Sequence, residues 1–486
     1  MTRHICTLHT QSLLAGLLAL ALGSCQKFLY VEPTNQVAIA SYDDVRALMG
    51  AHLKDFKATP GGSFQGATVP FIGDPSRLIL AYYSGDIDLQ SYMDTYIGRN
   101  NRKNVEGALQ WNHPDLHTNL WARMYRNIGF YNMILHELSK FPSGDASRDN
   151  QISAEARVLR AWSFFRLVTL FVPYSEPALG LPLNTSPETV GSYDASRPAQ
   201  AENYAFITSE LEAVLAYDGT RDEEYGVFYD PYIIHAILAQ VYLYKGGSAA
   251  GEMADYEKAL SHAREALKSG VDYRVFDRHV PNATRGFYPD NGFALFDVVV
   301  SGNETQNYVG YPPYVNVYPS EETLALYADN DLRKSVYFDP SNDYALLKPK
   351  ANTMYALDEF VLFSGAELKL IAAEALARLG RDDEAKAELL AFAASRYDEG
   401  TEPPYAGEPV LTSIIKERHR EFLLEGDIVW VDAARTGGTI THYATDKNDG
   451  SVYTLEGGDF RYTLPLPKTG ELDRNTIVQN PGWGAF

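Results

Sequence analysis

The chain has 486 residues, and its 63 acidic against 42 basic side chains give a formal net charge of −21 at pH 7. Such a charge repels phosphate backbones, so we expect no nucleic-acid partner. The two cysteines, Cys6 and Cys25, both lie near the N-terminus. The rest of the chain therefore has no disulfide, no thiol nucleophile and no cysteine metal site.

The N-terminal segment predicts a lipoprotein signal peptide. Arg3 precedes an apolar run at residues 13–22 that is well short of the roughly 20 residues a membrane-spanning helix needs. The run ends in Leu-Gly-Ser-Cys, which resembles a bacterial lipobox. We expect residues 1–24 to be removed and Cys25 to be acylated as the first mature residue. The alternatives are an ordinary secretory signal with a chance cysteine and a buried N-terminal helix.

The next segments have mostly helical periodicity. Residues 117–138 carry one apolar stripe, which predicts an amphipathic helix. Residues 151–171 are apolar on more than one side, which predicts a mostly buried helix that Pro173 ends. A proline- and glycine-containing stretch at 172–196 predicts a long loop, and a further helix is expected at about 199–217.

Two later segments, 232–270 and 367–396, each have the pattern helix, glycine-containing turn, helix. They resemble tetratricopeptide units, in which small residues let paired helices approach closely. No clean repeat period connects them. We therefore predict a mostly all-α fold, with tetratricopeptide-like helix pairs as a scaffold, large irregular loop-rich insertions and a few short strands.

The composition includes 33 tyrosines, many of them in two segments. The larger segment is an insertion at 271–356, rich in Gly, Pro, Asn and Tyr, with a short strand expected at 293–300. The other is the stretch 70–96. Aromatic faces stack on the C–H faces of pyranose rings, and neighbouring Asp, Asn and Arg side chains can hydrogen-bond the hydroxyls. Both segments are candidate sugar platforms, with ordinary packing of buried tyrosines as the alternative.

Several stretches together resemble the SusD/RagB family of Bacteroidetes outer-membrane lipoproteins. They are CQKFLYVEPTNQ, WARMYRNIGFYNMIL, AEARVLRAWSFFRLVTLFVPYSEPALGLPL, ELKLIAAEALARLG, IIKERHREFLLEGDIVWVDAARTGG and YTLPLPKTGELDRNTIVQNPGWG. The resemblance spans nearly the whole mature chain. It implies an all-α tetratricopeptide scaffold at the cell surface that captures glycans and caps a SusC-like TonB-dependent transporter.

The domain organisation that follows is a signal peptide and one SusD/RagB-like domain over residues 25–486. We divide this domain into an N-terminal helical part (25–270), the tyrosine-rich insertion (271–356) and a C-terminal helical part with the tail (357–486). Candidate glycan-stacking residues are chosen from the tyrosine segments and from where the family usually places its ligand. They are Tyr82, Tyr92, Tyr308, Tyr311 and Tyr314.

Charged residues in the signature helices are interpreted as structural. In the segment IIKERHREFLLEGDIVWVDAAR, we expect Arg418 or Arg420 to pair with Glu421 or Glu425 beneath a loop that carries Trp430. The same interpretation applies to the glutamate and arginine of the AEAR segment, where buried, partnered ions are expected in place of catalytic groups.

No motif for an enzyme, a metal ion or a cofactor is present in the sequence. It lacks His-Glu-x-x-His, Gly-x-Ser-x-Gly, phosphate-loop and dinucleotide patterns, and its 11 histidines do not cluster. The acidic stretch 446–450 lacks calcium-loop spacing and predicts a turn. A pair of carboxylates for glycoside hydrolysis stays open, because 63 acidic residues always offer some pair.

The predicted function is that of a non-enzymatic, cell-surface lipoprotein for nutrient uptake. It captures oligo- or polysaccharides and delivers them to the transporter, and it reaches the outer membrane only through its lipid anchor, facing the exterior. One alternative is a tetratricopeptide-type scaffold lipoprotein that binds proteins. The other is a lipid-anchored glycosidase.

Overall fold

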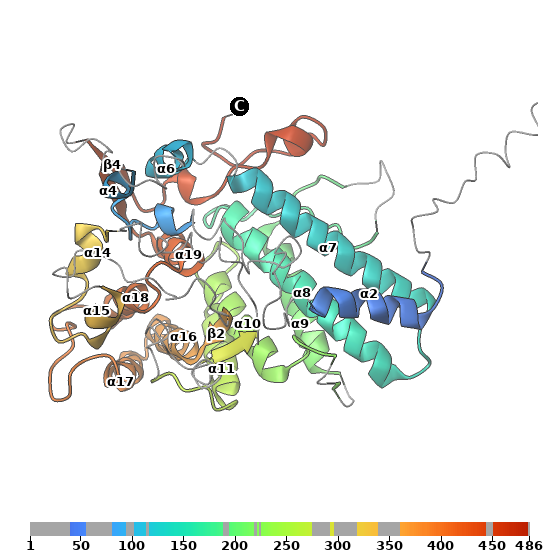
Figure 1. Cartoon of the computed structure of the whole chain (residues 1–486), viewed down its shortest axis with the longest axis horizontal. Coiled ribbons are helices and arrows are strands. Elements are labelled where there is room, and N and C mark those ends of the chain that lie inside the picture. Colours follow the sequence, from blue (N-terminus) through green and yellow to red (C-terminus); the bar gives the residue numbers. More distant parts are fainter. Residues whose placement is uncertain are drawn as a thin grey trace, which may run out of the picture.

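The computed structural model describes residues 39–54, 80–93, 102–112, 116–187, 194–217, 221–222, 225–274, 292–295, 318–338, 360–443 and 451–484. Most of these residues are helical (Figure 1). The helices are α2 (Tyr42–Lys54), α4 (Leu89–Met93), α6 (Arg102–Leu109), α7 (Leu116–Lys140), α8 (Ala146–Phe171), α9 (Gln200–Leu215), α10 (Pro231–Gly246), α11 (Met253–Leu267), α14 (Glu321–Ala325), α15 (Leu332–Tyr337), α16 (Gly365–Arg378), α17 (Asp382–Ala393), α18 (Val410–Glu421) and α19 (Gly426–Thr436), with the short turns η2 (Phe460–Tyr462) and η3 (Lys468–Leu472). The predicted mostly all-α fold is confirmed.

The two longest helices, α7 and α8, pack side by side (Figure 1). α8 begins where the side chain of Asp145 accepts the Ser147 N–H at 2.9 Å. It ends before Pro173, since Val172 has the extended backbone that a following proline favours. Nearly all of α8 after Asn150 is buried, because it is apolar on several sides. The structure confirms both predicted helices, and α8 starts five residues before the expected position.

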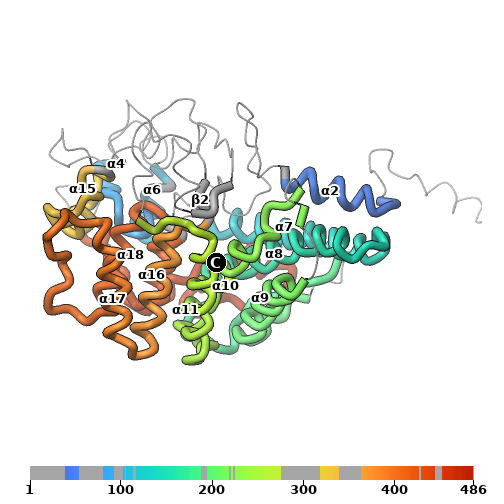
Figure 2. The backbone as a smooth tube through the Cα atoms, turned by 90° about the horizontal axis from the view of Figure 1, so that it is seen from below, coloured from blue at the N-terminus to red at the C-terminus, as the bar shows by residue number. Residues whose placement is uncertain are grey.

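The two helix pairs expected from the sequence are present and lie next to each other. α10 packs on α11, α16 packs on α17, and α11 packs on α16, so the two pairs form a continuous row of helices (Figure 2). Small residues permit this approach: Ala236, Ala239, Ala259 and Ala263 are fully buried. Gly246 of α10 faces the ring of Tyr256 so closely that a Cβ atom would lie 2.7 Å from it.

Four short strands form two small sheets. β1 (Gly292–Leu295) pairs antiparallel with β2 (Phe360–Ser364), and β3 (Ile440–Tyr443) pairs antiparallel with β4 (Val452–Leu455). β1 overlaps the first part of the strand expected at 293–300 and starts one residue earlier. The insertion 271–356 also contains α14 and α15, which the prediction of a non-helical insertion missed, because each helix has six residues or fewer and shows little periodicity.

The C-terminal tail is fastened to the end of α8. Asn480 donates from Nδ2 to the carbonyls of Phe171 at 2.9 Å and Leu464 at 2.8 Å, and Leu464 N–H donates to the Leu170 carbonyl at 2.8 Å. Arg197 donates to the Val478 carbonyl and to Asn480 Oδ1, each at 2.9 Å. The tail is therefore hydrogen-bonded to the end of α8 and to Arg197, which precedes α9.

Candidate functional site

Of the five tyrosines predicted to bind sugar, the structure describes the side chain of one. Tyr82 lies in a helical segment at 80–83 and is 4% exposed, so it is a core residue with no open ring face for a sugar. We therefore withdraw it from the candidate site. Tyr92 belongs to α4, and its side chain lies outside the described residues, as do Tyr308, Tyr311, Tyr314 and the lipidation residue Cys25.

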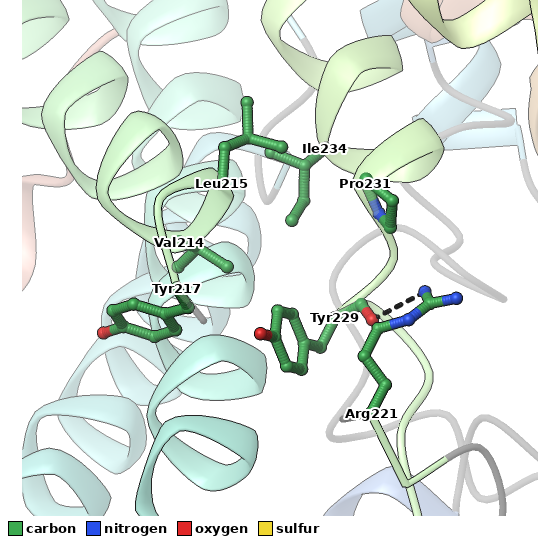
Figure 3. Close-up of a pocket in the computed structure, with 7 residues that line it drawn as sticks. All are labelled: Val214, Leu215, Tyr217, Arg221, Tyr229, Pro231 and Ile234. Atoms are coloured by element: carbon green, nitrogen blue, oxygen red, sulfur yellow. Dashed lines mark hydrogen bonds between the residues drawn. The ribbon is translucent and has the colours of Figure 1, made fainter. Parts of the chain in front are cut away.

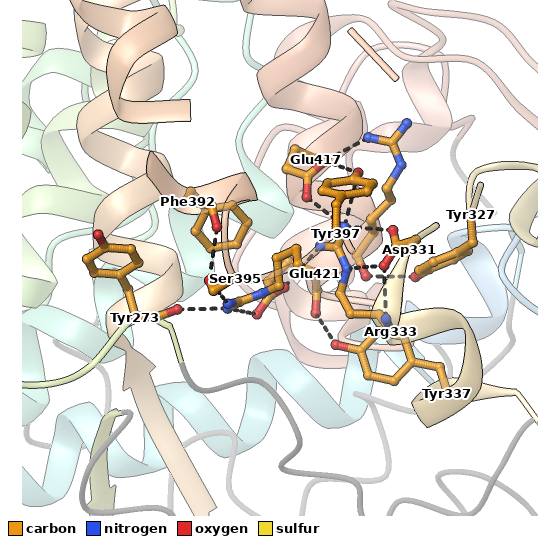
Figure 4. A network of polar contacts seen from close by, with 12 residues as sticks. Tyr273, Tyr327, Asp331, Arg333, Tyr337, Phe392, Ser395, Tyr397, Glu417 and Glu421 are labelled. Carbon is orange, nitrogen blue, oxygen red and sulfur yellow. Dashed lines mark hydrogen bonds and ion pairs between the residues drawn. The ribbon is translucent and has the colours of Figure 1, made fainter. Parts of the chain in front are cut away.

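A buried ionic cluster is formed by Asp331, Arg333, Arg396, Glu417 and Glu421, which joins α15 to α18 (Figure 4). Arg333 donates to Asp331 Oδ2 at 2.8 Å, Glu417 Oε1 at 2.6 Å and Glu421 Oε2 at 3.1 Å. Arg396 donates to both oxygens of Glu421 at 2.9 Å. All five side chains are at most 1% exposed, so the cluster is a structural tie with no open face for a ligand.

A second buried cluster joins α16, α18 and α19. Arg418 donates to Asp432 at 2.6 Å, and Arg435 donates to Glu374 at 2.6 and 2.7 Å. Burial by itself would raise the pKa of Glu374, but the neighbouring guanidinium groups of Arg435, Arg418 and Arg378 lower it to about 2. The carboxylate is therefore charged across the physiological range.

These clusters confirm the structural interpretation of the charged motif and correct its pairings. Arg418 pairs with Asp432, and Arg420 pairs with Glu417 at 2.8 Å, in place of Glu421 or Glu425. Glu421 instead faces the arginines of the first cluster. The expected loop with Trp430 is helix α19, and the Trp430 side chain is fully buried.

A cavity of about 270 Å³ opens between the end of α9 and the start of α10 (Figure 3). Its lining consists of Val214, Leu215, Tyr217, Arg221, Tyr229, Pro231 and Ile234. The rings of Tyr217 and Tyr229 stand nearly perpendicular, at 77°, with centroids 6.3 Å apart. Both tyrosines are half-buried, so each combines a held ring with an accessible part.

Residues of α8 contact the Tyr217 hydroxyl and the backbone that carries Tyr229. The Ser153 hydroxyl lies 2.9 Å from the Tyr217 hydroxyl. The buried carboxylate of Glu155 accepts three successive backbone N–H groups, from Val227 at 2.8 Å, Phe228 at 2.7 Å and Tyr229 at 3.0 Å. A buried carboxylate requires such donors, and here they fix the loop that carries the Tyr229 ring.

Arg221 is the charged residue of the cavity lining, and Asp230, beside the lining, pairs with it. Arg221 donates from Nη1 to Asp230 Oδ2 at 2.6 Å and to the Tyr229 carbonyl at 2.9 Å. Asp230 also caps α10, since its Oδ1 accepts the N–H groups of Tyr232 at 2.8 Å and Ile233 at 3.2 Å. Aromatic faces beside fixed charged groups can hold a ligand that is apolar on its faces and polar at its edge, such as a sugar.

Two further features of the described residues concern metal ions and membranes. Within the ranges that the structure describes, no three His, Cys, Asp or Glu side chains are grouped to hold a metal ion. His235 and His262 meet across 27 positions of sequence, with their Nδ1 atoms 2.8 Å apart. Among the helices described, none combines the length and the apolarity that a bilayer crossing requires.

Comparison with known proteins points to one group. Residues 84–243, which include the whole cavity lining, match the SusD-like_3 family model, described as "Starch-binding associating with outer membrane". A SusD superfamily protein from Bacteroides fragilis matches with a TM-score of 0.68 and 19% identity over 89% of this chain and 97% of that one. The chain has the SusD-like fold. The predicted resemblance to that family is thereby confirmed.

Two further SusD-like structures come from Bacteroides vulgatus. One is titled a putative sugar binding protein, with 20% identity, a TM-score of 0.65 and coverage of 92% of this chain and 100% of that one. The other is titled a SusD-like carbohydrate binding protein, with 21% identity, a TM-score of 0.59 and coverage of 86% and 89%. No curated protein matches the chain.

The cavity between α9 and α10 was not predicted from the sequence. Tyr217 and Tyr229 lie outside the two tyrosine-rich segments, so composition did not single them out. One local signal was available: Asp230-Pro231 is a helix start, with an N-cap aspartate before a proline at the first helical position. It marks the α10 end of the cavity but not the tyrosine that faces it from α9.

Proposed function

We propose that the chain is a cell-surface lipoprotein that captures oligo- or polysaccharides and passes them to a SusC-like TonB-dependent transporter. One observation carries the proposal: residues 84–243 match a family described as "Starch-binding associating with outer membrane". The titles of two similar structures, which refer to sugar or carbohydrate binding, agree with it.

Four of the predicted tyrosines remain in this proposal as stacking residues. They are Tyr92, Tyr308, Tyr311 and Tyr314. Tyr308, Tyr311 and Tyr314 are spaced three residues apart, so each ring can stack on a different sugar unit of one glycan. Such stacking requires no catalytic group. We therefore propose that the protein binds glycans and does not cleave them.

The proposal places the mature protein at the outer membrane, with its lipid on Cys25 and its sugar-binding surface facing outward. Replacement of Cys25 by Ser removes the acylated sulfur, so the variant should leave the membrane fraction. Protease added to intact cells should degrade the wild-type protein if it faces outward. A wild-type protein that stays protected in intact cells but not in lysed cells would contradict the orientation.

Calorimetry with a panel of purified polysaccharides and host-type oligosaccharides tests the capture step. The sample is the mature chain with Cys25→Ser, which carries no lipid and needs no detergent. We expect saturable binding to one glycan class, no release of reducing sugar, and about tenfold weaker binding for Tyr311→Ala or Tyr314→Ala. Release of reducing sugar would favour a glycosidase, and the absence of binding across the panel would favour a protein-binding scaffold.

A further inference from the structure

We infer that the cavity between α9 and α10 binds one neutral sugar ring, the terminal unit of a captured glycan. This inference rests on the proposed function and adds to it a second site, separate in sequence from the tyrosine-rich segments. The site consists of Tyr217, Arg221 and Tyr229 from the cavity lining. Asp230 lies outside the lining and pairs with Arg221, and Ser153 and Glu155 support the site from α8.

The apolar part of the site suits the faces of a pyranose. Tyr217 and Tyr229 meet at 77° and form a corner (Figure 3). In this corner a sugar ring can stack on one tyrosine while its edge contacts the other. Val214 and Ile234 are buried beside the rings and close the inner end with aliphatic carbon. A flat ligand with C–H groups on its faces fills such a corner better than an extended chain does.

The polar part of the site suits hydroxyl groups. Arg221 uses Nη1 for Asp230 and for the Tyr229 carbonyl, whereas its Nε and Nη2 have no partner among the described residues. These N–H groups can donate to sugar oxygens, and Asp230 can accept from a neighbouring hydroxyl. The pair is partly exposed, with 32% of the Arg221 side chain and 27% of the Asp230 side chain accessible, so a ligand can reach it.

The charge of the site selects against acidic sugars. The carboxylate of Asp230 already neutralises Arg221 at 2.6 Å, so an added carboxylate or sulfate finds no unpaired cation there. The net charge of −21 adds a weak, salt-screened repulsion of anions. The preferred ligand class is therefore a neutral hexose or pentose unit.

The volume of the cavity limits the number of sugar units that it can bind. Its volume of about 270 Å³ lies below the roughly 300–1,000 Å³ of pockets for drug-sized ligands. A single sugar ring fits this volume, so the rest of a longer glycan must lie outside the cavity. Since Ser153 holds the Tyr217 hydroxyl and Glu155 holds the backbone of Tyr229 before any ligand arrives, less ordering is required on binding.

Saturation-transfer NMR and calorimetry with small probes test the inference. The probes are the methyl glycosides of glucose, galactose, mannose and xylose, with free glucuronate as the acidic comparison. The protein is the mature chain with Cys25→Ser. We expect at least one neutral glycoside to bind saturably and glucuronate to bind more weakly.

Variants of the lining then assign the probe to the cavity. Tyr229→Ala should weaken binding about tenfold, because it removes a stacking face, whereas Tyr229→Phe should retain most of the affinity. Arg221→Met should also weaken binding. Tyr232→Ala is the matched control, because Tyr232 is a nearby exposed tyrosine that does not line the cavity. Thermal unfolding confirms that each variant is folded.

The outcomes separate this inference from the proposed function. If polysaccharides bind but no methyl glycoside does, or if Tyr229→Ala and Arg221→Met leave glycoside affinity unchanged, the cavity site is wrong and glycan capture stands. Tighter binding of glucuronate than of every neutral probe overturns the neutral class. If neither polysaccharide nor glycoside binds, both proposals are wrong.

Discussion

The carboxylate of Glu155 accepts the backbone N–H of Tyr229 at 3.0 Å, across 74 positions of sequence. Glu155 belongs to α8, and Tyr229 forms a wall of the cavity before α10. Through this contact, a buried acid in a signature helix determines where an aromatic ring stands at the surface.

Replacement of Glu155 by Gln should destabilise the protein. An amide offers one oxygen where the carboxylate uses two, so at least one buried N–H among residues 227–229 loses its acceptor. An unsatisfied buried group costs about 1–3 kcal/mol. Urea unfolding measures the loss, and Glu399→Gln on the exposed surface is the control. Equal stability of the two variants would show that these hydrogen bonds contribute little.

Replacement of Arg333 by Met should be more damaging. It leaves Asp331, Glu417 and Glu421 buried with fewer cations, and removal of one partner from a buried pair costs about 3–5 kcal/mol. Arg381→Met breaks the exposed pair with Glu384 and should cost less than about 1 kcal/mol. Chemical denaturation of both variants gives the comparison. The buried cluster would not be a structural tie if the two losses were alike.

Replacement of two helical glycines by alanine should change the stability of the protein in opposite directions. Gly246→Ala places a methyl group against the ring of Tyr256, where a Cβ would lie 2.7 Å away, and should cost about 1–3 kcal/mol. Gly129 of α7 has nothing within 4 Å of that position, so Gly129→Ala should stabilise by up to about 1 kcal/mol through helix propensity. Thermal unfolding midpoints measure both changes. A stabilising Gly246→Ala would mean that α10 and α11 pack less closely than described.

Stability should fall between about pH 6.5 and pH 4 because of His442. Burial lowers the pKa of His442 to about 4, from an ordinary value of 6.5, so the unfolded state binds a proton more readily than the folded state in this window. The free energy of unfolding therefore rises with pH there, by up to roughly 3 kcal/mol from this group, and the contribution is constant below about pH 4.

Denaturant unfolding at several pH values checks the effect of His442. His442→Phe retains a ring against Trp111, which stacks on His442 at 4.4 Å between centroids, but removes the titrating nitrogen. Its stability should depend less on pH than that of the wild type. Replacement of the exposed His136 by Gln should leave the pH dependence as it is. An unchanged slope in His442→Phe would contradict the assignment.

Much of the fold could be predicted from the sequence. The spans of α7, α8, α10 and α11 follow from apolar spacing and from proline and glycine signals, which depend only on neighbours along the chain. The helix pairs and the resemblance to SusD-like proteins were also readable. The short helices α14 and α15 were not, because five or six residues are too few to show a period.

The candidate site depended on contacts that the sequence does not contain. Tyr82 belongs to a tyrosine-rich stretch, yet packing buried it, whereas Tyr217 and Tyr229 lie outside the two segments chosen for their tyrosines and meet at the cavity. Composition counts tyrosines but does not show which ring faces solvent.

The sequence by itself determined the helical class, the lipoprotein signal as an expectation, and the structural nature of the charged motifs. Tertiary structure decided the partners: Arg418 with Asp432, Glu421 with Arg333, and Glu155 with the Tyr229 loop. The physical reason is that helix formation is governed by residues three and four apart, whereas a buried charge takes whichever distant group the packing of whole helices brings within hydrogen-bond distance.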